Sequence, residues 1–198
     1  MKITLLDINK NMTDAWSKYF EKEDVSIINS SFEDFMNNNY DVDAVVSPAN
    51  SFGLMDGGYD KAITDYFGSK LMKEVQKEIL IRWHGEQPVG TSMSVPIYNR
   101  VFNTIYGSKI CQLIHTPSMR TPEVIKDSRI IYQCMRTTLI EALRLEVNNI
   151  VIPAFGGLTG GVPFEEVARM MYLAYKQVFN QPSELNWGYA LHIAKSLK

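Results

Sequence analysis

The chain alternates short apolar runs with longer segments of helical periodicity, and this alternation limits the folds it can adopt. Short continuous apolar runs are typical of buried strands, whereas apolar residues three and four positions apart are typical of helices packed on one side. The expected strands are residues 2–6, 25–29, 43–47, 89–97, 110–115 and 149–152. The expected helices are residues 11–21, 58–66, 68–80, 122–144, 163–179 and 186–197.

Strands that alternate with helices favour a sheet covered by helices on both faces. We therefore predict an α/β fold, a three-layer α/β/α sandwich with a mixed, largely parallel central sheet, formed by residues 1–198 as one domain. Turn residues between 89–97 and 110–115 indicate a hairpin. The longest helix is expected to begin at Pro122 because proline is tolerated in the first turn of a helix.

The charge balance bears on the partners that the chain can bind. It has 20 Lys and Arg and 22 Asp and Glu, mixed along the sequence, for a formal net charge of −2. No basic stripe is present, so we expect no generic binding to DNA or RNA. A small phosphate-bearing ligand remains compatible, because backbone N–H groups hold phosphates without a side-chain cation.

Cys111 and Cys134 lie in apolar segments without metal-ligand spacing around them. We expect buried free thiols in a reducing compartment, and neither a metal nor a cofactor. The N-terminal apolar stretch is too short for a signal peptide, and no run of about 18 apolar residues occurs. These features predict a cytoplasmic protein that does not engage a membrane.

Two glycine-rich loops carry the strongest functional signals. The first, residues 47–63, leaves an apolar strand and enters a helix, with Asn50 in the loop and Asp60 in the first helical turn. These two side chains fit a polar site, although an Asx turn and a favourable charge at a helix N-terminus account for them equally well. The second loop, residues 153–166, has four glycines before a helix and lacks the Walker A ending. Free N–H groups and the helix dipole make such a loop an anion site.

The two loops together resemble those of the macro-domain family. The first family loop reads approximately N-A-A-N-S-x-L-x-G-G-G-x-D-x-A-I, and here Asn50 and Asp60 keep its spacing. The second is similar to Pro153 through Pro163, and IHTPSMRTP at 114–122 looks like another family strand end. The resemblance covers about residues 25–180 and is closest to the branch of ADP-ribose 1″-phosphate phosphatases.

The resemblance implies a cleft for ADP-ribose or a derivative. It implies two catalytic residues: Asn50 would orient the distal ribose, and Asp60 would position or deprotonate the attacking water. The residues that it implies in ligand binding are Ser31, Phe32, Ala49, Asn50, Ser51, Gly57, Gly58, Tyr59, Phe155, Gly156, Gly157, Leu158, Thr159, Gly160 and Gly161.

The sequence departs from the family pattern at several positions. Ser47 replaces an asparagine, Asp56 a glycine, and Leu158 a glycine of the diphosphate loop. The family's adenine-reading aspartate, in a G-D-I motif, has Ser31 in its place, which predicts weaker discrimination of adenine. Asp7 lies in a similar motif but one strand too early in the sequence.

Two classes of function follow. The first is a hydrolase that removes a phosphate from the distal ribose or cleaves an ADP-ribosyl ester, with an ADP-ribosylated protein as a further partner. The second is a non-catalytic reader or sequestering protein for ADP-ribose or a related nucleotide signal. Retention of Asn50 and Asp60 favours the enzyme, and His115, at a strand end, is the next catalytic candidate.

Overall fold

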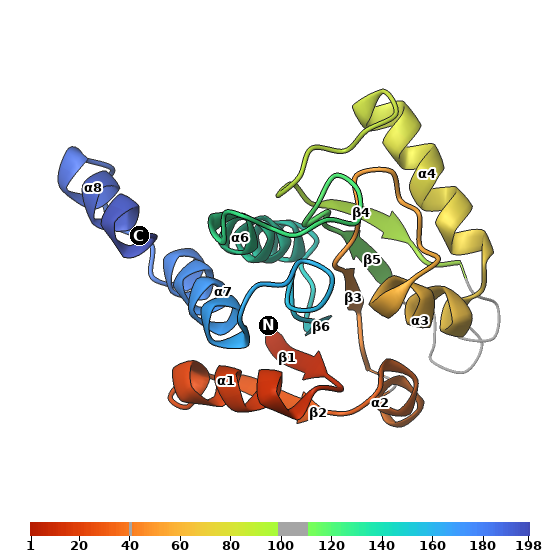
Figure 1. The fold of residues 1–198 in the computed structure, drawn as a ribbon, viewed down its shortest axis with the longest axis horizontal. Helices are drawn as coiled ribbons and strands as arrows, with labels where there is room; N and C mark the ends of the chain where they lie inside the picture. The colour runs from red at the N-terminus through yellow and green to blue at the C-terminus, as the bar shows by residue number, and fades with distance from the viewer. Residues whose placement is uncertain (40, 99–110) are drawn as a thin grey trace.

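A six-stranded sheet in the order β2-β1-β6-β3-β5-β4 forms the centre of the molecule (Figure 1). The computed structural model describes residues 1–39, 41–98 and 111–198. All neighbouring strands are parallel except β4, which pairs antiparallel with β5 at one edge. The strands are β1 (Lys2–Asp7), β2 (Val25–Asn29), β3 (Ala44–Ser47), β4 (Met93–Pro96), β5 (Gln112–His115) and β6 (Asn149–Ile152).

Helices cover both faces of this sheet. Helices α1, α6 and α7 contribute to the hydrophobic core on one face, and α2, α3 and α4 to the core on the other. The helices are α1 (Lys10–Phe20), α2 (Phe32–Asn38), α3 (Gly58–Phe67), α4 (Lys70–Trp83), α6 (Arg129–Arg144), α7 (Phe164–Phe179) and α8 (Trp187–Ser196). The predicted three-layer fold is therefore confirmed.

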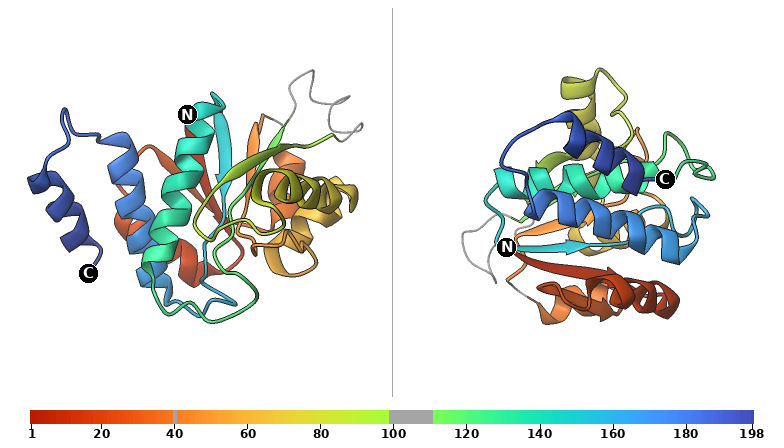
Figure 2. Two further views of the ribbon diagram at one scale, coloured as in Figure 1. Left: turned by 90° about the horizontal axis from the view of Figure 1, so that it is seen from above. Right: turned by 90° about the vertical axis from the view of Figure 1, so that its left-hand side faces the viewer.

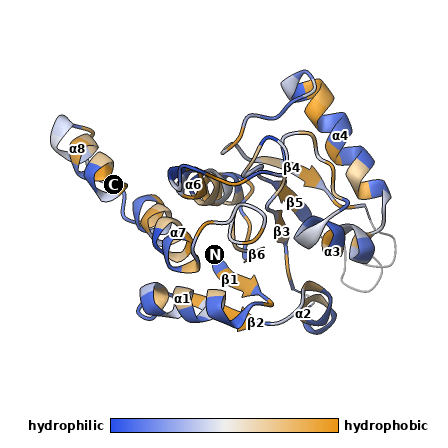
Figure 3. Cartoon of the chain, viewed as in Figure 1, coloured by the Kyte–Doolittle hydropathy of each residue, from blue (hydrophilic) through white to orange (hydrophobic). Residues whose placement is uncertain are grey.

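The apolar pattern of each element explains its place. All four residues of β3 and of β6 are buried, as expected for strands covered on both faces, and Figure 3 shows hydrophobic residues concentrated on the central strands. Helix α8 differs, since it has no buried residue. Figure 2 places it outside α7, away from the sheet, where Arg169 donates a hydrogen bond to the carbonyl oxygen of Ser196 at 2.9 Å.

The predicted helix 122–144 was wrong at its start, because α6 begins only at Arg129. The preceding segment crosses the second glycine loop instead: the N–H of Ile125 donates to the carbonyl oxygen of Gly160 at 2.8 Å. This tertiary hydrogen bond takes the place of the helical bonds that Pro122 and the apolar spacing had suggested.

Helix α2 was not predicted, although the sequence holds its start signal. Ser31 is the N-cap, and its hydroxyl oxygen accepts a hydrogen bond from the N–H of Asp34 at 3.1 Å. A serine followed three residues later by an acidic residue is a known start signal for a helix.

Both cysteines are buried free thiols, as predicted. Strands β4 and β5 pair as the expected hairpin, while most of its connection lies outside the described residues. None of the helices in the described ranges combines the length and the apolar run that a membrane crossing requires.

Candidate functional site

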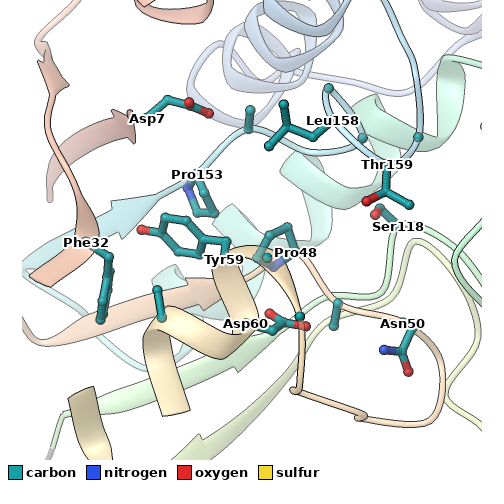
Figure 4. Close-up of a pocket in the computed structure, with 18 of the residues that line it drawn as sticks. Asp7, Phe32, Pro48, Asn50, Tyr59, Asp60, Ser118, Pro153, Leu158 and Thr159 are labelled. Carbon is teal, nitrogen blue, oxygen red and sulfur yellow. The ribbon is translucent and has the colours of Figure 1, made fainter. Parts of the chain in front are cut away.

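A cleft of about 510 Å³ opens at the carboxyl ends of the parallel strands. Its lining includes Asp7 at the end of β1, Ser30 after β2, Pro48 after β3, Ser118 after β5 and Pro153 after β6. Parallel strands bring their carboxyl ends to one edge of the sheet, where ligands of α/β proteins bind. The volume lies in the usual range for small-molecule sites. Figure 4 shows the residues around this space.

The first glycine loop is fixed by hydrogen bonds to the segment after β5. The N–H of Ala49 donates to the carbonyl oxygen of Thr116 at 3.1 Å, and the N–H of Ser118 donates to that of Ala49 at 3.0 Å. The side chain of Asn50 also serves this loop: its Oδ1 accepts from the N–H of Phe52 at 3.1 Å, and its Nδ2 donates to the carbonyl oxygen of Leu54 at 2.8 Å. Asn50 therefore lines the cleft while its amide holds the loop in shape.

Asp60 lies in the first turn of α3 at the cleft wall, and only 7% of its surface is exposed. Its Oδ1 accepts a hydrogen bond from Ser47 Oγ at 2.6 Å. Burial raises the pKa of this carboxyl to about 7, while the Ser47 hydrogen bond lowers it and the charge of Asp56 raises it. A carboxyl with a pKa near neutrality can accept or donate a proton at physiological pH.

The second glycine loop folds tightly on itself. A Cβ at Gly160 would lie 2.5 Å from the carbonyl oxygen of Gly156, so no larger residue fits there without moving the backbone. Gly156 itself has a φ of +71°, a conformation that favours glycine. The N–H of Val162 donates to Gly156 at 3.1 Å and closes the loop.

Backbone N–H groups from both loops are available to a ligand. Among the described residues, the N–H groups of Gly58, Tyr59 and Asp60 at the start of α3 have no hydrogen-bond acceptor, and neither have those of Leu158 and Thr159. Unpaired donors at a helix start and in a glycine loop suit an anion. The side chains of the described residues that line the cleft include three carboxyls and no Lys, Arg or His, so negative charge must be bound by the backbone.

The cleft brings together most of the residues that the sequence analysis proposed. Of these, Asn50, Asp60, Ser31, Phe32, Ala49, Gly57, Gly58, Tyr59, Gly156, Gly157, Leu158, Thr159 and Gly160 line it. Three others lie outside its lining. The side chains of Ser51 and Phe155 are fully buried, and Gly161 lies beyond the loop's contact with the cleft.

His115 does not reach the cleft. It is fully buried, its Nδ1 lies 2.7 Å from Oε1 of Gln87, and burial lowers its pKa to about 3. A neutral, inaccessible imidazole is a structural group here, so His115 is not a catalytic group of the cleft.

Several lining residues were missed from the sequence. They lie at or just after strand ends, or within or near the two loops: Asp7, Ile8, Ser30, Pro48, Leu54, Ala62, Ser118, Met119, Pro122, Pro153 and Ala154. Asp56 also lines the cleft and had been noted only as a departure from the family pattern. The signal that could have found many of them is the position just after each parallel strand.

The two loops and the segment that connects them fall in a recognised sequence family. Residues 46–171, more than half of the chain, match the Macro domain. The chain belongs to the macro domain family. A curated relative, an uncharacterised protein of Aquifex aeolicus, is 31% identical to this macro domain over 131 residues, which cover 66% of the chain and 71% of the relative.

Solved macrodomains have the same fold. A mutant of the Oceanobacillus iheyensis macrodomain with ADPR superposes with a TM-score of 0.59 at 21% identity, over 72% of this chain and 73% of that one. The Trypanosoma brucei macrodomain in complex with ADP gives 0.56 at 17% identity, over 80% and 64%. The Mycobacterium tuberculosis DarG macrodomain gives 0.56 at 19% identity, over 70% and 84%.

Proposed function

We propose that this macro domain binds ADP-ribose or a close derivative in the cleft and hydrolyses a group from its distal ribose. The unpaired N–H groups of both glycine loops supply the diphosphate site. The cleft volume of about 510 Å³ suits a nucleotide. Solved macrodomains that hold ADPR or ADP support the choice of ligand.

The observation that carries the hydrolase is the buried carboxyl of Asp60. Burial raises its pKa to about 7, and Ser47 holds it in one orientation at 2.6 Å. When ionised, Asp60 can remove a proton from a water that attacks the distal ribose or its substituent. Such positioned acid–base groups contribute about 10² to 10⁴-fold to a rate.

The charge of the cleft favours an ester over a phosphate as the group removed. Asp56 and Asp60 both line the cleft, and the charge of Asp56 acts on Asp60. A terminal phosphate dianion beside these carboxyls would be repelled, and no side-chain cation among the described lining residues offsets the repulsion. We therefore place ADP-ribosyl-ester hydrolysis ahead of ADP-ribose 1″-phosphate hydrolysis.

The test measures both ADP-ribose binding and the turnover of two substrates. Calorimetry with ADP-ribose measures binding, and release of ADP-ribose from an ADP-ribosylated protein and of phosphate from ADP-ribose 1″-phosphate measures the two reactions. We expect binding, and faster turnover of the ester. Absence of ADP-ribose binding contradicts the whole proposal, and faster release of phosphate contradicts the preference for the ester.

A non-catalytic reader is the second candidate, and one observation favours it. Both polar groups of the Asn50 amide bond to the loop's own backbone, which leaves less freedom to orient a reacting ribose. Tight binding of ADP-ribose without release of any product from either substrate would favour the reader.

A further inference from the structure

One segment of the chain contacts both glycine-rich loops. Residues 119–125 belong to the connection between β5 and α6, and we call them the bridging segment. Its first two residues, Met119 and Arg120, accept the N–H of Ser51 with their carbonyl oxygens at 3.2 and 3.1 Å. The side chain of Arg120 is fixed in turn by a bidentate ion pair with Glu86, at 2.6 and 2.9 Å. The start of the bridging segment is therefore attached to the first glycine loop.

The end of the bridging segment is attached to the second glycine loop through Ile125. The N–H of Ile125 donates to the carbonyl oxygen of Gly160 at 2.8 Å. Its side chain also packs against this loop: the Cδ1 atom lies 2.8 Å from the position that a Cβ on Gly160 would take, and 2.6 Å from that of a Cβ on Gly156. Ile125 therefore fills the space that these two glycines leave open.

The contacts of Ile125 enclose the part of the second loop that has free donors. Leu158 and Thr159, whose N–H groups have no acceptor among the described residues, lie between Gly156 and Gly160. The side chain of Ile125 is itself supported, since it packs against the core cluster under α1, α6 and α7. A loop held at both ends keeps its donors in one orientation, so a ligand does not have to order them when it binds.

Hydrogen bonds within the second loop do not set its distance from the first loop. The N–H of Val162 donates to the carbonyl oxygen of Gly156 at 3.1 Å, and that of Gly161 donates to the carbonyl oxygen of Leu158 at 2.9 Å. These bonds fix the internal shape of the loop. The bridging segment is attached to both loops, and Figure 4 shows residues of the two loops around the same space. The bridging segment therefore sets the spacing between the donors of the first loop and those of the second.

We propose that Ile125 is a positioning residue for the bound ligand: by holding the second loop to the bridging segment, it keeps the N–H groups of both glycine loops at the spacing that one ligand needs. This inference rests on the proposed function, in which those N–H groups bind the diphosphate. A smaller side chain at this position leaves the bonds within each loop intact and lets the second loop move relative to the first. The donors must then be ordered on binding, which lowers the affinity.

Calorimetry with ADP-ribose tests this role in the full chain with three substitutions at one position. Ile125→Val removes the Cδ1 atom that packs against both glycines, Ile125→Ala removes most of the side chain, and Ile125→Leu keeps its volume. We expect the affinity to fall about 3-fold with valine and about 10-fold with alanine, and to stay near the wild-type value with leucine. For the ester substrate, Ile125→Ala should raise KM and leave kcat unchanged, because the diphosphate takes no part in the bond that breaks.

Ile150→Val is the matched control, because Ile150 is fully buried in the same core cluster and is not part of the cleft lining. It should lower the Tm and leave ADP-ribose affinity unchanged. Wild-type affinity in Ile125→Ala, or an equal loss of affinity in Ile150→Val, overturns the role of Ile125 while the proposed function stands. A fall in kcat at an unchanged KM in Ile125→Ala overturns it as well. If wild type binds no ADP-ribose, the proposed function itself fails.

Discussion

Replacement of Asp60 by asparagine should make the protein more stable and less active at the same time. The folded protein holds this carboxyl protonated up to a pKa of about 7, whereas its ordinary value is 3.8. Between these two pH values the native state binds a proton that the unfolded state has lost, so stability falls as pH rises. One pH unit is worth about 1.4 kcal/mol, which makes the full loss about 4 kcal/mol above pH 7.

Asparagine has nearly the same shape and does not titrate. Its Oδ1 can still accept the hydrogen bond that Ser47 Oγ gives to Asp60 at 2.6 Å. Urea unfolding at about pH 5 and about pH 8.5 measures, at each pH, the gap in the free energy of unfolding between Asp60→Asn and wild type. We expect the gap to widen by about 3 kcal/mol in favour of Asp60→Asn at the higher pH.

Activity should move in the opposite direction. Wild-type kcat on the ADP-ribosyl ester should rise with pH through about 7 as Asp60 ionises. Asp60→Asn should lose about 10² to 10⁴-fold in kcat with little change in ADP-ribose affinity. An equal difference in the free energy of unfolding between the two proteins at both pH values would refute the argument that burial holds this carboxyl protonated. Full activity of the variant would place the acid–base group elsewhere.

Three further predictions follow from the same contacts. Gly57→Leu should fold normally, because a Cβ added at Gly57 meets no atom within 4 Å. Since Gly57 lines the cleft, the leucine side chain should lower ADP-ribose affinity by about 10-fold or more. Gly160→Ala, whose added Cβ meets backbone at 2.5 Å, should instead lower the Tm by several degrees. His115→Gln should lose less free energy of unfolding than wild type between about pH 7 and 4.5, as measured by urea unfolding at both pH values. The pKa of His115 is lowered from 6.5 to about 3, so wild type loses about 3 kcal/mol over that interval as its unfolded state takes up a proton. Ser47→Ala should move the midpoint of the kcat–pH profile to higher pH, because the Ser47 hydrogen bond lowers the pKa of Asp60; an unmoved or lower midpoint contradicts that effect.

The sheet and the two loops were predictable because their signals are local. Each buried strand is a continuous apolar run, and each loop concentrates its glycines between a strand and a helix. The start of α6 was not predictable in this way. The N–H of Ile125 donates to the carbonyl oxygen of Gly160, which is 35 residues away in sequence. No local sequence pattern around Pro122 predicts that contact.

The position of Asp7 in the cleft illustrates a second limit. Sequence order places it one strand before the turn at Ser30, and only the pairing of β1 with β2 makes the two neighbours. Strand order is set by packing across the whole sheet rather than by residues near Asp7. The helix that begins after Ser31 is a different case, since its capping signal was present in the sequence and was overlooked.

The sheet divides the hydrophobic core into two clusters, and each cluster contains one cysteine thiol that can be labelled chemically. Cys111 belongs to the cluster packed under α2, α3 and α4, and Cys134 to the cluster under α1, α6 and α7. Both thiols are at most 1% exposed, and burial raises the pKa of each, so alkylating reagents reach them only when a face opens. Labelling rates at the two positions, read by mass spectrometry, therefore measure the opening of each face separately. A ligand seated across the strand ends should slow labelling at both.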